Sequence, residues 1–377
     1  MPSRRDFFKN VACAAAGFVV AGCRGSDSGG AGRRQIMLGG RRITTVDVHA
    51  HCYVDVVDMV KGHEWGNVVK RNIDYPGCKT IPCWGPDARG PWGVNAERGG
   101  WNAHRVRLMD QLGVDVHALS INPYWYSAEQ GLARELMQAQ NEKLAAACKA
   151  YPDRFVGLAS VALQYPDMAA QQLEEAVKKL GMRGVAIGCG VNGEQLASPR
   201  FDPFWAKVQE LGVLVYIHPQ GDPGRPTERL QGSGNLMNVI GFPLETSAAL
   251  SHLIFEGTLD RFPGVKIGGA HGGGFLPSYI GRSDASCDWT PRCKPIKKKP
   301  SEYFRDQILC DSLVFTDHAL RHLVAQYGAS QVVFGTDFPA GWPTRGVDHI
   351  LETSGLNDAE KEAILGGNLV KLLRIET

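Results

Sequence analysis

Short apolar runs alternate along this chain with longer segments whose apolar residues recur at helical spacing. An apolar run of about four to eight residues, bounded by polar or turn residues, is typical of a buried strand. The runs lie at residues 43–48, 114–121, 155–161, 184–188, 213–217, 265–270, 307–310 and 331–334. The pattern therefore predicts eight strands, each buried on both faces.

Helix signals lie between these runs. Ser127 and Asp167 are placed to cap helices that end near residues 150 and 181. Asp202 is placed to cap a third helix, with a proline at its first helical position, and Gly212 follows the last turn of that helix. Further helices are expected at residues 103–112, 244–256, 317–327 and 358–373.

Strands that alternate with helices favour a parallel sheet covered by helices. Eight such units in a chain of 377 residues predict an α/β fold of the (β/α)8 TIM barrel type. A doubly wound open sheet is the structural alternative, but the chain offers no glycine-rich phosphate fingerprint to support it. The insertion at residues 54–100 follows the first strand and is rich in Gly, Pro and Trp, so we expect it to form a lid over the site.

The N-terminal segment has the features of an export signal. Residues 3–9 read SRRDFFK, and the apolar run that follows is shorter than the ~20 residues that span a bilayer. The run ends in Val20-Ala21-Gly22-Cys23, which resembles a bacterial lipoprotein cleavage box. We expect residues 1–22 to be a twin-arginine export signal, Cys23 to carry lipid, and residues 23–42 to form a flexible tether. The predicted location is periplasmic or at the cell surface, and the alternative is an unstructured leader with a chance arginine pair.

Composition excludes some partners. Hydrophobic residues make up 44% of the chain and charged residues 21%, with a formal net charge of +2, as in an ordinary soluble globular protein. A nucleic-acid-binding protein would concentrate basic residues on one face, so no nucleic-acid partner is expected. Two cysteine pairs are close enough in sequence to form disulfides in an oxidising compartment, Cys78 with Cys83 and Cys287 with Cys293, and most other cysteines are expected to be buried thiols.

Histidines and an aspartate lie at the ends of four predicted strands. His49 and His51 alternate at the end of the first strand and so point to the same side. His218, His271 and Asp337 end the fifth, sixth and eighth strands. In a (β/α)8 barrel the carboxyl ends of all strands meet at one face. Imidazole and carboxylate are ligands of zinc and similar cations, so the pattern predicts a metal site there.

The chain resembles the amidohydrolase superfamily, and within it the branch of aminocarboxymuconate-semialdehyde decarboxylase, from residue 43 to the C-terminus. Motifs near residues 101–120 match the early pattern of that branch. The other motifs that carry the resemblance are Gly241-Phe242-Pro243-Leu244-Glu245-Thr246, Phe262-Pro263, Ala270-His271-Gly272-Gly273-Gly274, Gly281-Arg282, Tyr303-Phe304, Cys310-Asp311-Ser312-Leu313-Val314 and Gly335-Thr336-Asp337-Phe338-Pro339.

The resemblance implies a role for each site residue. His49, His51, His218 and Asp337 would bind one divalent metal ion, with zinc (Zn2+) the expected ion. His271 would act as general acid/base, since an imidazole changes protonation state near neutral pH. Residues 183–189 hold no lysine that would bridge a second ion, so the site is expected to be mononuclear.

The expected activity is the nonoxidative decarboxylation of an unsaturated or aromatic carboxylic acid. Arg282 would bind the substrate carboxylate across the interface of a homodimer, with Arg89 or Arg98 of the lid as a second cation. The alternative is a hydrolase of an ester, lactone or amide, in which Asp337 would take a proton from the attacking water. A third alternative is an exported binding or structural protein with a degenerate site, and the complete ligand set counts against it. Asp311 and Asp47 are candidates to orient a ligand histidine, and Asp47 alternatively to close the barrel.

Overall fold

A computed structural model describes residues 32–54, 56, 58–63, 100–220, 227–293, 296–340, 342 and 345–376. The predicted export signal, Cys23, Cys78, Cys83, and the arginines of the expected lid, Arg89 and Arg98, lie outside the described residues. Of the insertion expected over residues 54–100, only a few positions at its two ends are described. Among the described residues, no helix has both the length and the apolar character needed to cross a bilayer.

Eight parallel strands form the inner layer of residues 33–376, in the order β12-β11-β10-β9-β6-β5-β4-β3. Each overlaps one of the apolar runs of the sequence, so all eight predicted strands are confirmed. Their bounds are β3 Val46–His51, β4 Val116–Ser120, β5 Phe155–Ala159, β6 Gly184–Ile187, β9 Leu214–Ile217, β10 Lys266–Gly269, β11 Ile308–Asp311 and β12 Val332–Val333.

The first and last strands meet, which gives a nearly closed barrel. Val48 N donates to Phe334 O at 3.0 Å, and His51 N donates to Phe338 O at 2.7 Å. Phe338 N in turn donates to His49 O at 3.1 Å. The predicted (β/α)8 architecture is therefore confirmed, with the segment after the short strand β12 completing the ring.

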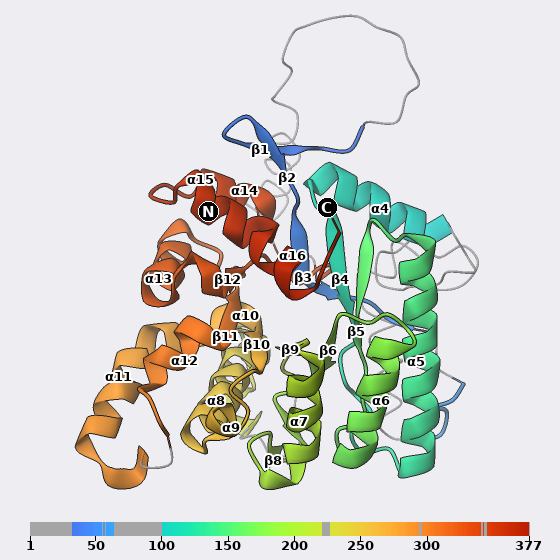
Figure 1. Cartoon of the computed structure of the whole chain (residues 1–377), viewed down its shortest axis with the longest axis vertical. Helices are drawn as coiled ribbons and strands as arrows, with labels where there is room; N and C mark the ends of the chain where they lie inside the picture. The colour runs from blue at the N-terminus through green and yellow to red at the C-terminus, as the bar shows by residue number, and fades with distance from the viewer. Residues whose placement is uncertain are drawn as a thin grey trace, which may run out of the picture. The chain divides into compact units, whose positions relative to one another are not determined.

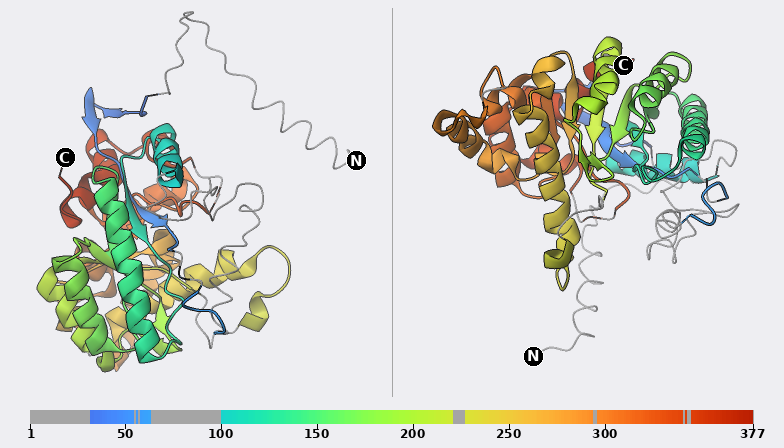
Figure 2. Two further views of the ribbon diagram at one scale, coloured as in Figure 1. Left: turned by 90° about the vertical axis from the view of Figure 1, so that its right-hand side faces the viewer. Right: turned by 90° about the horizontal axis from the view of Figure 1, so that it is seen from below.

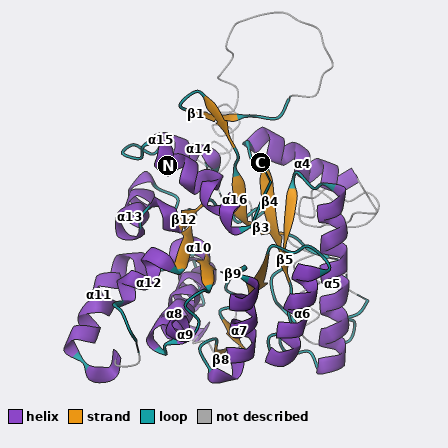
Figure 3. Ribbon diagram, viewed as in Figure 1, coloured by secondary structure: helices purple, strands orange, loops and turns teal. Residues whose placement is uncertain are grey.

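Helices cover the outside of these strands (Figures 1 and 3). Figure 2 shows helices of the first half of the barrel, in green, and of the second half, in orange, on opposite sides of the strands. The helix bounds are α4 Gly100–Leu112, α5 Gln130–Ala150, α6 Pro166–Lys178, α7 Asp202–Leu211, α8 Phe242–Phe255, α9 Thr258–Arg261, α10 Ala270–Gly273, α11 Leu276–Trp289, α12 Pro300–Asp306, α13 Asp317–Tyr327, α14 Val347–Glu352, α15 Asp358–Glu362 and α16 Asn368–Leu372.

Alternate residues of the strands separate two apolar clusters. In β9, Val215 and Ile217 belong to the large cluster that also holds helix residues such as Leu250. Leu214 and Tyr216 belong to a smaller cluster formed mainly by strand residues. This division is the period-two pattern of a sheet buried on both faces.

Three predicted caps are wrong, among them Asp202, which is the first residue of α7 while Phe201 occupies the cap position. Glu129, not Ser127, caps α5, because its carboxylate accepts from Leu132 N at 2.6 Å and from Gly131 N at 2.8 Å. Asp167 lies within the first turn of α6, where its charge still favours the helix N-terminus. The predicted end of α7 at Gly212 is confirmed, with φ of 59°.

The helix predicted over residues 358–373 is present over residues 358–372 and contains a π turn. This five-residue turn, Ala363–Gly367, lies between α15 and α16. Within it the Ile364 carbonyl accepts from Phe334 N at 2.9 Å, so the turn supports the end of β12. A side chain at Gly366 would place its Cβ 2.0 Å from Thr44 O, which explains the glycine at this close approach.

The last part of the segment predicted as tether is ordered. Strands β1 (Ile36–Leu38) and β2 (Arg41–Ile43) form an antiparallel ribbon. Ile36 is buried, and Arg34 N donates to Asp110 O at 2.9 Å. The barrel domain therefore begins before the predicted residue 43, because this ribbon packs on it. A disulfide joins Cys287, in the last turn of α11, to Cys293. It is one of the two predicted pairs.

Candidate metal centre

Four predicted ligands come together at the carboxyl ends of the strands. His49 and His51 end β3, His218 follows β9, and Asp337 follows β12. One ligand atom from each lies within 4.8 Å of the others, and all four side chains are buried. In the part of the chain that is described, this is the one group with the geometry to hold a metal ion.

The chemistry of this group fits a cation. The Nε2 atoms of His49, His51 and His218 are buried, and none makes a well-aligned hydrogen bond with a described residue. Asp337 Oδ1 lies 3.2 Å from Nε2 of His49 and 2.9 Å from Nε2 of His51. Buried polar nitrogens without partners are rare in folded proteins. A divalent cation bound by three imidazoles and one carboxylate would satisfy them together.

Without a cation, the cluster retains a proton. Burial opposes a charged imidazole, but the carboxylates of Asp337 and Asp311 outweigh it and raise the pKa of His49 to about 10. Burial and the neighbouring His51 hold the pKa of His218 well below its usual value. Burial would raise the pKa of Asp337, yet His49 and His51 keep it well below the usual range. Binding of a cation would replace the proton on His49.

Neighbouring groups fix the direction of the ligands. His49 Nδ1 lies 2.7 Å from Asp311 Oδ2, as expected for a carboxylate that orients a ligand histidine. Trp342 Nε1 donates to Asp337 Oδ2 at 2.8 Å. The Gln220 side-chain amide lies 3.2 Å from Nδ1 of His218.

His271 lies beside the cluster in a left-handed turn. Its ring centroid is 5.1 Å from that of His49 and 5.0 Å from that of His218. Its φ is 56°, which costs a residue other than glycine roughly 1–2 kcal/mol. Burial and the charge on His49 lower its pKa to about 4, so the ring is neutral at neutral pH. The sequence predicted a pKa near neutrality for His271. The lower pKa means that the free site presents His271 as a neutral base.

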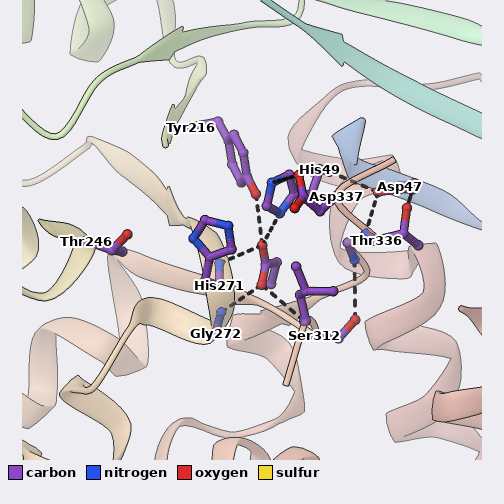
Figure 4. A network of polar contacts seen from close by, with 12 residues as sticks. Asp47, His49, Tyr216, Thr246, His271, Gly272, Ser312, Thr336 and Asp337 are labelled. Atoms are coloured by element: carbon purple, nitrogen blue, oxygen red, sulfur yellow. Dashed lines mark hydrogen bonds and ion pairs between the residues drawn. The ribbon is translucent and has the colours of Figure 1, made fainter. Parts of the chain in front are cut away.

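Asp47 serves the barrel rather than the imidazole of a ligand. It accepts from His49 N at 2.9 Å and from Thr336 N at 3.2 Å, and so ties β3 to the segment after β12 (Figure 4). Next to it, the buried Arg105 donates to His51 O at 2.9 Å and to His117 Nδ1 at 3.1 Å. Of the two alternatives for Asp47, the structure favours closing of the barrel.

Arg282 is not at the metal cluster. It is exposed on α11 and makes no ion pair with any described residue. Its predicted contact with substrate would require a partner subunit and stays a prediction.

The sequence missed several residues around the centre. Tyr216 precedes His218 by two positions, and the period of a strand would have placed both on the same side. Arg105 and Trp342 had no local signal, because nothing in their flanking residues shows that they reach the ligand-bearing segments.

A barrel with a single mononuclear metal site at its carboxyl face defines a class of metal-dependent enzymes. The family model described as amidohydrolase matches residues 46–375. The chain therefore belongs to the amidohydrolase family, as the motifs of the sequence predicted.

Relatives of the chain are named as decarboxylases. It is 32% identical over 341 residues to 2-amino-3-carboxymuconate-6-semialdehyde decarboxylase of Dictyostelium discoideum, with 88% of this chain and 85% of the relative covered. The structure of 5-carboxyvanillate decarboxylase from Sphingomonas paucimobilis superposes with a TM-score of 0.74 at 25% identity, over 89% of this chain and all of the other. A dihydroxybenzoic acid decarboxylase from Polaromonas, solved with manganese and 2-nitroresorcinol, gives a TM-score of 0.71 at 25% identity, over 88% and 97% of the two chains.

Proposed function

We propose that this protein is a metal-dependent, nonoxidative decarboxylase of an aromatic or unsaturated carboxylic acid. The observation that carries the proposal is the cluster of three buried imidazole nitrogens and one carboxylate, with His271 at its side. The decarboxylase names of its relatives support the reaction class. In this proposal His49, His51, His218 and Asp337 hold the ion.

The reaction requires one proton at carbon. A divalent cation, when bound, supplies positive charge that orients an anionic substrate and stabilises charge that develops on it. His271 would deliver a proton to the carbon that bears the carboxylate. The bond between that carbon and the carboxylate then breaks, its electrons return to the ring or the conjugated chain, and carbon dioxide leaves. An anionic substrate beside His271 would raise its pKa from about 4 and so help it to take up the proton from solvent.

A substrate panel tests the proposal directly. The purified mature protein, loaded with Zn2+ or Mn2+, is incubated with hydroxybenzoates, carboxyvanillate and muconate-type acids, and in parallel with esters, lactones and amides. Release of carbon dioxide from an acid supports the decarboxylase. Turnover of the hydrolase substrates alone would replace it with the hydrolase alternative.

For the ion, we propose a single divalent cation and retain zinc as the candidate on the basis of its ligands. Three imidazoles and a carboxylate suit Zn2+, and manganese was present in a related structure. Metal analysis of protein purified without added metal, followed by reactivation of chelator-treated protein with each ion, decides between the two.

We propose a homodimer in which Arg282 reaches the substrate of the partner subunit. The exposed position of Arg282 on α11 leaves it available for such a contact. Mixed dimers of Arg282→Ala and His271→Ala subunits test it: the one site with both native residues would restore part of the activity that each variant lacks.

We also propose export by the twin-arginine route and lipid attachment at Cys23. The disulfide Cys287–Cys293 supports an oxidising compartment. Fractionation of cells that express the native chain, Arg4→Lys/Arg5→Lys or Cys23→Ser tests the two steps separately. The double lysine variant should remain inside the cell, and Cys23→Ser should be exported without the lipid.

A further inference from the structure

The most densely hydrogen-bonded carboxylate near the metal centre belongs to Asp311, at the end of β11. It is fully buried and plays no direct part in the proposed chemistry. Figure 4 shows four of its neighbours, His49, Tyr216, His271 and Gly272, lying close to one another. Oδ2 accepts from His49 Nδ1 at 2.7 Å, Tyr216 Oη at 2.9 Å and His271 N at 3.0 Å, and Oδ1 accepts from Gly272 N at 2.7 Å and Leu313 N at 3.1 Å.

These donors belong to two parts of the site. One is the imidazole of His49, in the ligand group, and the other is the backbone of the left-handed turn that presents His271. We propose that Asp311 is a positioning residue that couples the two: it directs Nε2 of His49 toward the ion and holds His271 beside it. The role of His271 in this coupling rests on the proposed function.

The hydrogen bonds of Asp311 decide the tautomer of His49. Oδ2 accepts from Tyr216 Oη and His271 N, and Oδ1 accepts from Gly272 N and Leu313 N, so both oxygens act as acceptors. Facing such an acceptor at 2.7 Å, His49 must donate from Nδ1. Its Nε2 then carries the lone pair that a metal ligand needs.

An amide at position 311 cannot satisfy the same donors. If its NH2 group replaced Oδ1, it would face the N–H groups of Gly272 and Leu313. If it replaced Oδ2, it would face His271 N, and it would donate to Nδ1 of His49, which places the imidazole proton on Nε2 and blocks metal binding. Asp311→Asn therefore damages either the turn or the ligand.

Asp47 provides a matched control. It is also a fully buried aspartate near the centre, and it also accepts a hydrogen bond from His49. That bond comes from the backbone N, and none of the described contacts of Asp47 involves the His271 turn. Asp47→Asn therefore measures the effect on metal affinity of replacing a buried carboxylate near the centre that does not contact the His271 turn.

The proposal can be tested by two measurements for which no substrate is needed. Competition of Zn2+ or Mn2+ with a chelator should show affinity about 10–100-fold weaker in Asp311→Asn, and a smaller loss in Asp47→Asn. Amide hydrogen exchange at His271 and Gly272 should accelerate in Asp311→Asn alone. Equal losses of affinity in the two variants, or unchanged exchange in Asp311→Asn, would overturn the coupling. If Asp311→Asn does not fold, Tyr216→Phe, which removes one donor, should weaken the ion several-fold; unchanged affinity would overturn the proposal.

A double-mutant cycle tests the second part of the proposal, that Asp311 acts on catalysis through His271. At saturating metal, Asp311→Asn should lower kcat more than it raises KM in the native background, and lower it little further in His271→Ala. Additive losses of kcat in the two single variants and the double variant would refute this part of the proposal. Absence of decarboxylation with every acid would instead refute the proposed function, while the affinity and exchange results would still decide the positioning role.

Discussion

His218 and His271 show how position decides chemistry at the scale of single residues. Their ring centroids are 5.0 Å apart, yet only His218 belongs to the group of ligand atoms. We predict that His218→Ala loses bound metal and activity, whereas His271→Ala keeps the metal and loses activity by about 100-fold or more. Elemental analysis beside a carbon dioxide assay checks both. Full metal occupancy in His218→Ala would refute the ligand assignment.

The proton on His49 makes metal binding depend on pH. Because its pKa is raised to about 10, the metal-free site is protonated at pH 7, and the ion must displace that proton. Apparent affinity should therefore rise about tenfold per pH unit between pH 7 and 9 and level off above pH 10. Calorimetry in buffers of different ionisation enthalpy should show about one proton released per ion at pH 7. Release of none would mean that His49 is already neutral in the free protein.

The sequence was sufficient for the residues whose roles follow from strand geometry. His49 and His51 alternate at a strand end, and the other ligands end strands that converge in a barrel. The low pKa of His271 could not be predicted in this way. It depends on burial and on the charge of His49, which lies far away in the sequence. Contacts such as Trp342 with Asp337 likewise depend on how a loop folds back.

At the scale of elements, the glycine turn after β10 leaves no room for side chains. Gly273 has φ of 75°, and a Cβ there would lie 2.5 Å from Cys310 Sγ. We predict that Gly273→Ala lowers the free energy of unfolding by roughly 1–3 kcal/mol and displaces His271. Gly281, in α11, has open space around its Cβ position, so Gly281→Ala should raise stability by about 0.5–1 kcal/mol. Urea unfolding of both variants provides the comparison, and equal stabilities would contradict it.

Most elements were predictable because each strand is a short apolar run and each long helix has its own periodicity. The predictions were wrong where an element serves a distant segment. The helix expected over residues 358–373 contains a π turn, Ala363–Gly367, and the Ile364 carbonyl of this turn accepts from Phe334 N. The cap of α5 shifted by two residues because Glu129, a residue type outside the usual caps, reaches two backbone N–H groups.

For the whole molecule, the ion should stabilise the barrel. Its ligands come from β3, from the residue after β9 and from the segment after β12, so one bound cation links distant parts of the ring. At a free metal concentration 100-fold above Kd, binding to the folded state alone contributes about 2.7 kcal/mol. We predict that a chelator lowers Tm and that added Zn2+ or Mn2+ restores it. His218→Ala should show no such shift, and a native Tm indifferent to both treatments would contradict the prediction.

The closing contacts between β3 and the segment after β12 have a consequence for biosynthesis. Asp337 is made 286 residues after His51, the difference between 337 and 51, and without it the growing polypeptide offers an incomplete cage. Metal capture must therefore wait until almost the entire chain has left the ribosome. A bound ion would therefore mark a protein whose synthesis and folding are both complete, and a cellular step that accepts only folded proteins could depend on it.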